Sequence, residues 1–263
     1  PDGYLSLCSP VKSIPVIHDL NFEHYPEDIP LITRKYHKKY FPLFVKKASR
    51  IATVSEYSKQ DISTIYNIPS DKIDVVYSAN NISFGANNTS DETDIMHGSR
   101  KKNNIRNQQL VSAFGDKWNE SEYFFYIGAL IPRKNIVRLL QAFEQFKKSF
   151  PSEVKLVIAG KKMWKTNDIE NVYRNMNFRD DVVFTGRLEA DELKDVMSGA
   201  LALVFVSCFE GFGVPIIEAM HCNLPVITSN VTSMPEIAGD AALLVDPFSI
   251  DSIKNGMMRI YKD

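Results

Sequence analysis

Cysteine is scarce in this 263-residue chain, which contains only Cys8, Cys208 and Cys222. Three widely spaced cysteines exclude a disulfide framework and a zinc site of the usual spacing. No apolar run is long enough to span a bilayer, and the opening residues show no signal-peptide pattern. Lysine and arginine total 31 against 32 aspartates and glutamates, so the net charge of −1 gives no general attraction to nucleic acid. We therefore expect a cytoplasmic protein that binds no nucleic acid.

The second half of the sequence has the pattern of a doubly wound parallel sheet. Short apolar runs alternate there with helical patterns, and the runs are continuous, as expected for parallel strands covered on both faces. The six candidate strands are Tyr123–Ile127, Val154–Ala159, Val182–Thr185, Leu201–Val206, Pro225–Thr228 and Ala242–Val245. The fold class is therefore α/β, with a complete Rossmann-like domain predicted over residues 123–263.

The first 82 residues predict a second, partial α/β domain. Its candidate strands are Ile14–Ile17, Arg50–Val54 and Ile73–Tyr77, which are too few for a whole sheet of this kind. Pro42 is expected to interrupt the long helical stretch between the first two strands. Residues 83–122 are rich in Asn, Ser, Asp, Gly and Lys, which predicts an interdomain linker with one short helix around Ile105–Ala113.

Residues 209–219 (Phe-Glu-Gly-Phe-Gly-Val-Pro-Ile-Ile-Glu-Ala) form the strongest candidate site. They follow a buried strand, and ligands in open parallel sheets bind at the carboxyl ends of strands. Gly211 and Gly213 allow backbone N–H groups to approach a ligand. Pro215 suits the first turn of a helix, whose N-terminus attracts anions such as phosphate.

Two carboxylates, Glu210 and Glu218, flank these glycines. They would repel a phosphate, whereas hydroxyl groups of a sugar or a ribose donate charge-assisted hydrogen bonds to carboxylates. A structural reading of Glu218 alone, as an acid that stabilises the first turn of a helix, remains equally good.

A basic turn, Gly128–Asn135, follows the strand Tyr123–Ile127. Arg133 and Lys134 stand there at a helix start, where the helix dipole disfavours cations unless an anion neutralises them. A pyrophosphate would bind both, Arg133 through a forked pair of hydrogen bonds and Lys134 as a point charge. The alternative is a solvated basic pair at a surface turn.

Three other patterns have two readings each. His18 and Asp19 follow a strand and suit either acid–base chemistry or a structural role. Glu236 looks catalytic by its position, but Ser233 to Glu236 fits a capping box, in which Glu236 bonds back to its own helix start, and we favour the capping box. Residues 30–50 contain seven Lys and Arg and no acid, interleaved with aromatic and aliphatic residues. They fit either a solvated helix face or peripheral contact with an anionic membrane.

These strings together resemble the donor-binding half of glycosyltransferase family 4, whose members have the GT-B architecture of two Rossmann-like domains. The family hallmark is a Glu, seven intervening residues and a second Glu, matched here by Glu210 and Glu218. The resemblance covers nearly all of residues 123–263. His18-Asp19-Leu20 and residues 53–58 (Thr-Val-Ser-Glu-Tyr-Ser) resemble the acceptor domain of the same family.

The resemblance implies a role for each matching residue. Arg133 and Lys134 would hold the diphosphate of the donor, in the turn that Gly128 opens. Glu218 would bind the ribose, and Glu210, with His18, would act at the transferred sugar. The remaining donor-binding residues implied are Gly211, Phe212 and Gly213, through their N–H groups, and Thr185 and Leu188, which bound a loop facing the base.

The implied function is retaining transfer of a hexosyl group from a nucleoside-diphosphate sugar to a saccharide or lipid-linked acceptor. No Asp-x-Asp occurs in the sequence, so no metal and no other cofactor is expected. The Pro-Arg-Lys-Asn turn resembles mannosyltransferase-like bacterial members and favours GDP-mannose over a UDP-sugar. A sugar-nucleotide epimerase, a phosphorylase and a non-catalytic nucleotide-binding remnant remain open alternatives.

The pattern departs from the family in two loop residues and at its ends. The family usually has Pro-Ser before the aromatic-Glu pair, where this sequence has Val206-Ser207-Cys208-Phe209, and Asn223 stands where a glycine is usual. The first strands and glycine-rich loop of the acceptor domain have no counterpart, and the sequence closes inside an amphipathic pattern without a C-cap. These features predict that the sequence is part of a longer chain.

Overall fold

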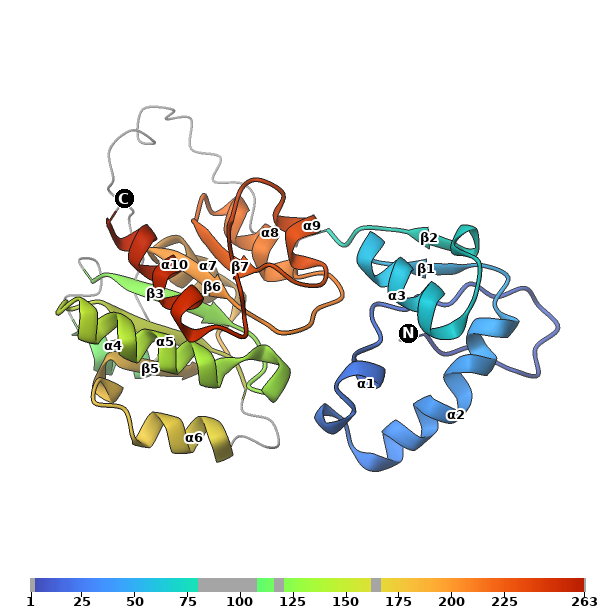
Figure 1. The fold of residues 1–263 in the computed structure, drawn as a ribbon, viewed down its shortest axis with the longest axis horizontal. Helices are drawn as coiled ribbons and strands as arrows, with labels where there is room; N and C mark the ends of the chain where they lie inside the picture. The colour runs from blue at the N-terminus through green and yellow to red at the C-terminus, as the bar shows by residue number, and fades with distance from the viewer. Residues whose placement is uncertain (1–2, 80–107, 116–120, 162–166, 263) are drawn as a thin grey trace. The chain divides into compact units, whose positions relative to one another are not determined.

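The computed structural model describes residues 3–79, 108–115, 121–161 and 167–262, and the chain divides into two compact units (Figure 1). Unit 1 consists of Pro1–Ala79 together with two segments of the second half, Cys208–Val214 and Val231–Gly239. Unit 2 consists of Asn80–Ser207, Pro215–Asn230 and Asp240–Asp263. The domain boundaries at residues 82 and 123 stay a prediction, and residues 83–107 of the proposed linker lie outside the described residues.

Unit 2 is built on a parallel sheet of six strands in the order β5-β4-β3-β6-β7-β8. The strands are β3 Tyr123–Ile127, β4 Lys155–Ala159, β5 Val182–Gly186, β6 Ala202–Phe205, β7 Val226–Ser229 and β8 Leu243–Val245. All six predicted strands are confirmed, each to within one residue at either end. The order reverses beside β3, the arrangement in which a ligand crevice forms at the carboxyl ends of the strands.

Helices follow the strands of the second half of the chain. Their bounds are α4 Gln108–Phe114, α5 Ile136–Ser149, α6 Asn167–Arg174, α7 Ala190–Ser198, α8 Val214–His221, α9 Met234–Ala238 and α10 Ile250–Lys262, with 3-10 turns at Pro132–Lys134 and Arg179–Asp181. The apolar residues that recur every three or four positions along α5, a spacing that predicts a core-facing helix, are all buried: Ile136, Leu139, Leu140, Phe143 and Phe146. Helix α10 lies along α5 (Figure 1), and the rings of Phe146 and Tyr261 meet edge to face with centroids 5.5 Å apart.

Unit 1 contains a small parallel sheet of two strands, β1 Ile51–Thr53 and β2 Ile73–Val75. The third predicted strand, Ile14–Ile17, is wrong, because it forms only a single bridge between Val16 and Ala52. The Ile17 N–H donates to Ala52, and the Ala52 N–H donates to the Pro15 carbonyl. Pro15 has no N–H of its own to donate, which limits the ladder at this point.

The helices of unit 1 are α1 Asn21–His24, α2 Leu31–Lys47 and α3 Glu56–Tyr66, with 3-10 turns at Pro26–Asp28 and Ser70–Lys72. The prediction that Pro42 interrupts the long helix is wrong, because α2 continues through it. A proline inside a helix costs about 3 kcal/mol. The burial of Phe41, Phe44 and Val45 on the inner face of α2 offsets that cost.

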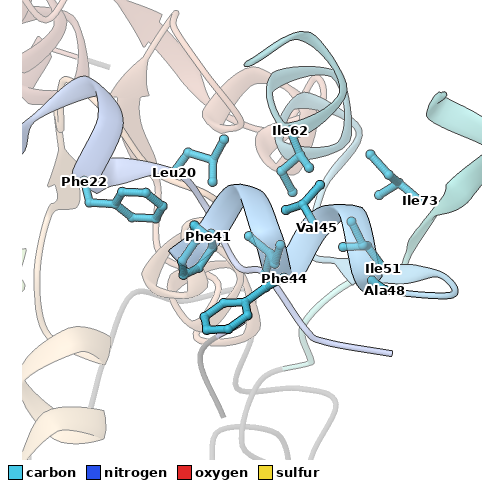
Figure 2. Packing of buried hydrophobic residues seen from close by; sticks show 10 residues of the cluster. Leu20, Phe22, Phe41, Phe44, Val45, Ala48, Ile51, Ile62 and Ile73 are labelled. Carbon is cyan, nitrogen blue, oxygen red and sulfur yellow. The ribbon is translucent and has the colours of Figure 1, made fainter. Parts of the chain in front are cut away.

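The core of unit 1 joins α2 to α3 and to the two strands (Figure 2). Phe41, Phe44 and Val45 come from α2, Ile62 comes from α3, and Ile73 comes from β2. Each of these side chains is at most 3% exposed. The position of α3 therefore depends on apolar packing against α2.

Phe44→Ala should destabilise unit 1 by about 3–5 kcal/mol, because it removes a buried ring from this cluster. Leu43→Ala, one residue away on the exposed face of α2, is the matched control and should change stability by less than about 0.5 kcal/mol. Chemical denaturation measures the free energy of unfolding of both variants, and hydrogen exchange measures the local opening of α2 and α3. Equal effects of the two substitutions would contradict the described packing of α2.

Candidate active site

The motif loop, Cys208–Val214, follows β6, ends on the first residue of α8 and carries the motif of two glycines. Glu210 is 7% exposed, and Gly211, Phe212 and Gly213 are also buried. The loop thus presents backbone rather than protruding side chains. This loop belongs to unit 1, together with the N-terminal 79 residues and Val231–Gly239, and its hydrogen bonds within that unit hold it in place.

Three buried serines bind three successive carbonyl groups of this loop. The Ser233 hydroxyl lies 3.0 Å from the carbonyl oxygens of both Glu210 and Phe212. The Ser55 hydroxyl donates to the Gly211 carbonyl at 2.6 Å, and the Ser58 hydroxyl lies 3.1 Å from the same oxygen. These serines are at most 1% exposed. Because buried polar groups are costly to leave unpaired, the hydrogen bonds fix the path of the loop.

Thr232 lies beside this loop in a strained backbone conformation. Its φ is +56°, in the left-handed region that β-branched residues avoid. Its hydroxyl oxygen accepts the N–H of Glu210 at 3.3 Å. The strain therefore coincides with a contact to a predicted catalytic residue.

Gly211 packs against the backbone next to His18, the second predicted catalytic residue. A Cβ atom at Gly211 would lie 2.5 Å from the His18 carbonyl oxygen and 2.7 Å from the Cβ of Asp19. The His18 carbonyl also accepts a hydrogen bond from Ser58 at 3.1 Å, and the His18 side chain is exposed. The structure thus brings His18 to the motif loop, and Gly211 is required for this close approach.

An aromatic cluster anchors the start of the same loop. The buried ring of Phe209 meets His24, Tyr25 and Tyr57 with centroid distances of 4.8, 5.8 and 6.0 Å. His24 also lies 2.9 Å from Asp61. Burial is the main cause that raises the pKa of Tyr57 to about 12, so its phenol stays protonated at neutral pH.

The other predicted donor-binding residues belong to unit 2. The loops after β3, β4 and β5 are joined at one sheet edge, since the Gly128 N–H donates to Ala159 and the Gly160 N–H donates to Gly186. A Cβ at Gly160 would lie 1.8 Å from the Gly128 carbonyl oxygen, so these turns touch through backbone. Thr185, at the end of β5, and Leu188, just after it, are both buried. The structure therefore places Gly128 at the carboxyl end of β3 and Thr185 and Leu188 at that of β5, with β4 between the two strands.

Arg133 and Lys134 lie in the 3-10 turn that precedes α5. Both are partly exposed, and the Lys134 ammonium lies 5.2 Å from the centre of the Phe205 ring at the end of β6. The buried Asn135 side chain fastens this turn, donating to Val206 at 2.9 Å and to Pro247 at 2.7 Å. The two cations are thus held at the carboxyl end of the central strands.

Glu218 lies on α8, one turn after the motif loop, and is half-buried. Burial alone raises the pKa of its carboxyl group. The ionised form is therefore disfavoured in the protein without ligand. Hydroxyl donors from a ligand would restore the solvation that burial removes.

Glu236 has a different role from the one that its sequence pattern predicts. The capping-box prediction is wrong, because the Ser233 hydroxyl makes no cap and bonds the motif loop instead. The carboxylate of Glu236 accepts the backbone N–H groups of Glu56 and Tyr57 at 2.8 and 3.0 Å. Sequence reasoning also missed Ser55, Ser58 and Ser233 as partners of the loop, since their contacts span 21 to 156 residues along the chain.

The described residues, 3–79, 108–115, 121–161 and 167–262, contain neither a membrane-spanning helix nor a metal-binding cluster. Within them, no helix has both the length and the hydrophobicity required to cross a bilayer. Nor do those residues contain a group of three or more His, Cys, Asp or Glu side chains placed to hold a metal ion.

Two curated proteins are similar to this chain over most of its length. O-antigen chain mannosyltransferase B of Escherichia coli is 28% identical over 96% of this chain and 62% of its own length. O-antigen chain mannosyltransferase RfbU of Salmonella typhimurium is 29% identical over 92% of this chain and 60% of its own length. The chain thus spans about three fifths of the length of these two relatives.

A solved structure and a family assignment complete the comparison. The Anabaena protein Alr3699/HepE in complex with UDP and glucose superposes with a TM-score of 0.71 at 18% identity, over 96% of this chain and 62% of that one. Such neighbours are GT-B glycosyltransferases, so the predicted α/β, GT-B-like fold class is confirmed. Residues 109–263 match the family described as glycosyl transferases group 1. The chain belongs to the group 1 glycosyl transferase family.

Proposed function

We propose that this chain takes part in retaining transfer of a hexosyl group from a nucleoside-diphosphate sugar to an acceptor hydroxyl. The observation that carries this proposal is the buried loop Cys208–Val214. It contains the buried Glu210, and buried serine hydroxyls bind its backbone carbonyls. Relatives named as O-antigen mannosyltransferases support a mannosyl donor and a polysaccharide or lipid-linked acceptor. GDP-mannose is the donor we favour, and the neighbour with bound UDP keeps a UDP-sugar as the alternative.

Arg133 and Lys134 bind the diphosphate in this proposal. The turn that holds them is fixed by Asn135, so the two cations are positioned before the ligand arrives. A guanidinium and an ammonium neutralise the charge that grows on the leaving phosphate, which is the work a divalent ion does in other transferases. We therefore propose a site that needs no metal.

Glu218 accepts hydrogen bonds from the ribose hydroxyls, and Glu210 accepts them from the transferred sugar. Thr185 and Leu188 face the base, and the N–H groups of Gly211, Phe212 and Gly213 meet the sugar and phosphate. The acceptor hydroxyl attacks the anomeric carbon on the face from which the nucleoside diphosphate departs, and the leaving phosphate takes its proton. His18 lies at the motif loop through Gly211 and acts at the sugar in this scheme.

We further propose that α2 contacts the cytoplasmic face of an anionic membrane. Its outer face carries Lys35 and Lys39 beside Ile32, which is 84% exposed, and Leu43, which is 45% exposed. Residues 30–50 contain no acid to repel an anionic lipid. Lysines interleaved with exposed apolar side chains suit the boundary between headgroups and acyl chains, where a lipid-linked acceptor would be found.

Arg133→Ala and Lys134→Ala should each weaken binding of GDP more than binding of GMP, because the lost cation faces the second phosphate. Loss of one charged hydrogen bond of about 1.5–3 kcal/mol corresponds to about tenfold or more in affinity. Calorimetry with both nucleotides, with and without EDTA, measures this, and Arg174→Ala on α6 is the control. Equal losses for GDP and GMP would place these residues away from the diphosphate, and loss of binding in EDTA would contradict the metal-free site.

Glu210→Gln should lower turnover by about tenfold or more while leaving GDP affinity nearly unchanged, since its partner is the sugar. Glu218→Ala should do the reverse and weaken GDP by about 1.5–3 kcal/mol, because it removes a charged acceptor from the ribose. Titration of GDP and release of nucleotide from GDP-mannose and UDP-glucose measure the two effects. If Glu210→Gln abolished GDP binding and Glu218→Ala did not, the two roles would be exchanged.

Lys35→Gln combined with Lys39→Gln should weaken binding to phosphatidylglycerol-containing vesicles by about tenfold or more, since each lysine contributes about 1 kcal/mol at such a surface. The control is Arg174→Gln combined with Arg179→Gln, which removes two exposed cations from unit 2. Vesicle sedimentation at low and high salt measures both proteins. Equal effects of the two double variants would mean that α2 is not the membrane-binding face.

A further inference from the structure

Helix α3 has an N-terminus that is capped by a residue far away in the sequence. The first N–H groups of a helix have no partner within the helix. Here Glu56 and Tyr57 donate theirs to the two carboxylate oxygens of Glu236, at 2.8 and 3.0 Å. The Ser58 N–H donates to the Ser55 hydroxyl at 3.0 Å. A carboxylate in this position gains both from charge-assisted hydrogen bonds and from the helix dipole.

The same turn of α3 binds the two segments that contain the predicted catalytic residues, Glu210 and His18. The Ser55 hydroxyl donates to Gly211, while the Ser58 hydroxyl lies 3.1 Å from the carbonyl oxygens of both Gly211 and His18. A Cβ at Gly211 would collide with the His18 carbonyl oxygen, so the backbones of Gly211 and His18 are in close contact. A shift of the N-terminal turn of α3 would therefore move Gly211 and His18 together.

Glu236 is also tied to the other side of the motif loop. It stands three residues after Ser233, whose hydroxyl binds the carbonyls of Glu210 and Phe212. The segment Ser233–Glu236 thus bonds the loop at one end and α3 at the other. The exposed Tyr77 also contacts this carboxylate, and its hydrogen bond to Glu236 raises the pKa of the phenol.

These contacts determine where the N–H groups of the loop point. A trans peptide is planar and places its C=O and N–H on opposite sides. Carbonyls held by Ser233 therefore direct the N–H groups of Gly211 and Gly213 away from Ser233. The Gly211 carbonyl, held by Ser55 and Ser58, directs the N–H of Phe212 away from α3. These are the three N–H groups assigned above to the sugar and phosphate.

We propose that Glu236 is a positioning residue for transfer, acting through α3 on Gly211 and His18 and, with Ser233, setting the N–H groups of the motif loop. The inference rests on the proposed function, because turnover is one of its readouts. Glu236 touches neither donor nor acceptor in this account. Its substitution therefore lowers the rate of transfer more than it weakens binding of the nucleotide.

Glu236→Gln keeps the length of the side chain but replaces one of its two acceptors with an amide donor that faces an N–H. Turnover should fall by about tenfold to a hundredfold, the range expected for misplacement of about 1 Å. The affinity for GDP should fall by less than turnover, because Arg133, Lys134 and Glu218, its other proposed ligands, are in unit 2 and keep their contacts. Amide exchange should accelerate at Glu56, Tyr57 and Ser58, and also at Gly211 and Phe212.

Ile62→Val is the matched control. Ile62 is fully buried in the apolar cluster on α3, and its side chain cannot form hydrogen bonds to Glu236 or to the motif loop. This substitution should lower the melting temperature by an amount similar to Glu236→Gln, with turnover within about twofold. Equal losses of turnover in the two variants would reduce Glu236 to a stabilising cap. Unchanged amide exchange at Gly211 and Phe212 in Glu236→Gln would overturn the positioning role whether or not the wild-type chain transfers sugar. Absence of nucleotide release by the full-length wild-type protein would instead contradict the proposed function.

Discussion

The candidate site depends on hydrogen bonding between three buried serine hydroxyls and the backbone carbonyls of Glu210, Gly211 and Phe212, with the Ser233 hydroxyl lying within reach of two of them. A glycine-containing loop of seven residues has little conformational preference of its own, since glycine adopts either sign of φ. Fixing it costs about 1–2 kcal/mol of backbone entropy per residue. Hydrogen bonds in a water-excluded setting offset that cost, because an unpaired carbonyl there would be penalised.

Several features of the site reduce stability in ways that suit ligand binding. Thr232 is held at positive φ, and Glu218 is kept as a half-buried acid whose pKa burial raises. Arg133 and Lys134 stand at the start of a helix, where the dipole repels cations. The costs at Glu218 and at the two cations would fall when a nucleoside diphosphate supplies hydroxyl donors to the carboxylate and negative charge to the cations. Preorganised, strained groups of this kind are typical of binding sites.

The sequence predicted secondary structure correctly where the local pattern of residues decides it. The six strands of unit 2 and the core stripe of α5 follow from apolar runs and from spacing of three and four residues, which packing then confirms. Local pattern misled at Pro15, Pro42 and Glu236. At Pro42 the burial of neighbouring rings outweighed a local penalty, and at Glu236 a partner 180 residues away outcompeted the helix start three residues away. The serines could not be found from sequence, because a serine beside a helix start looks the same whether it caps the helix or bonds a distant loop.

Crystal structures of the chain without ligand and with GDP would test most directly whether the motif loop is held ready by its serines. The account predicts that the hydroxyls of Ser55, Ser58 and Ser233 bind the same three carbonyls in both crystals, with GDP at Arg133 and Lys134 and no metal ion beside it. A loop that abandons these hydrogen bonds when GDP binds, or that adopts its described path only with ligand present, would contradict the account.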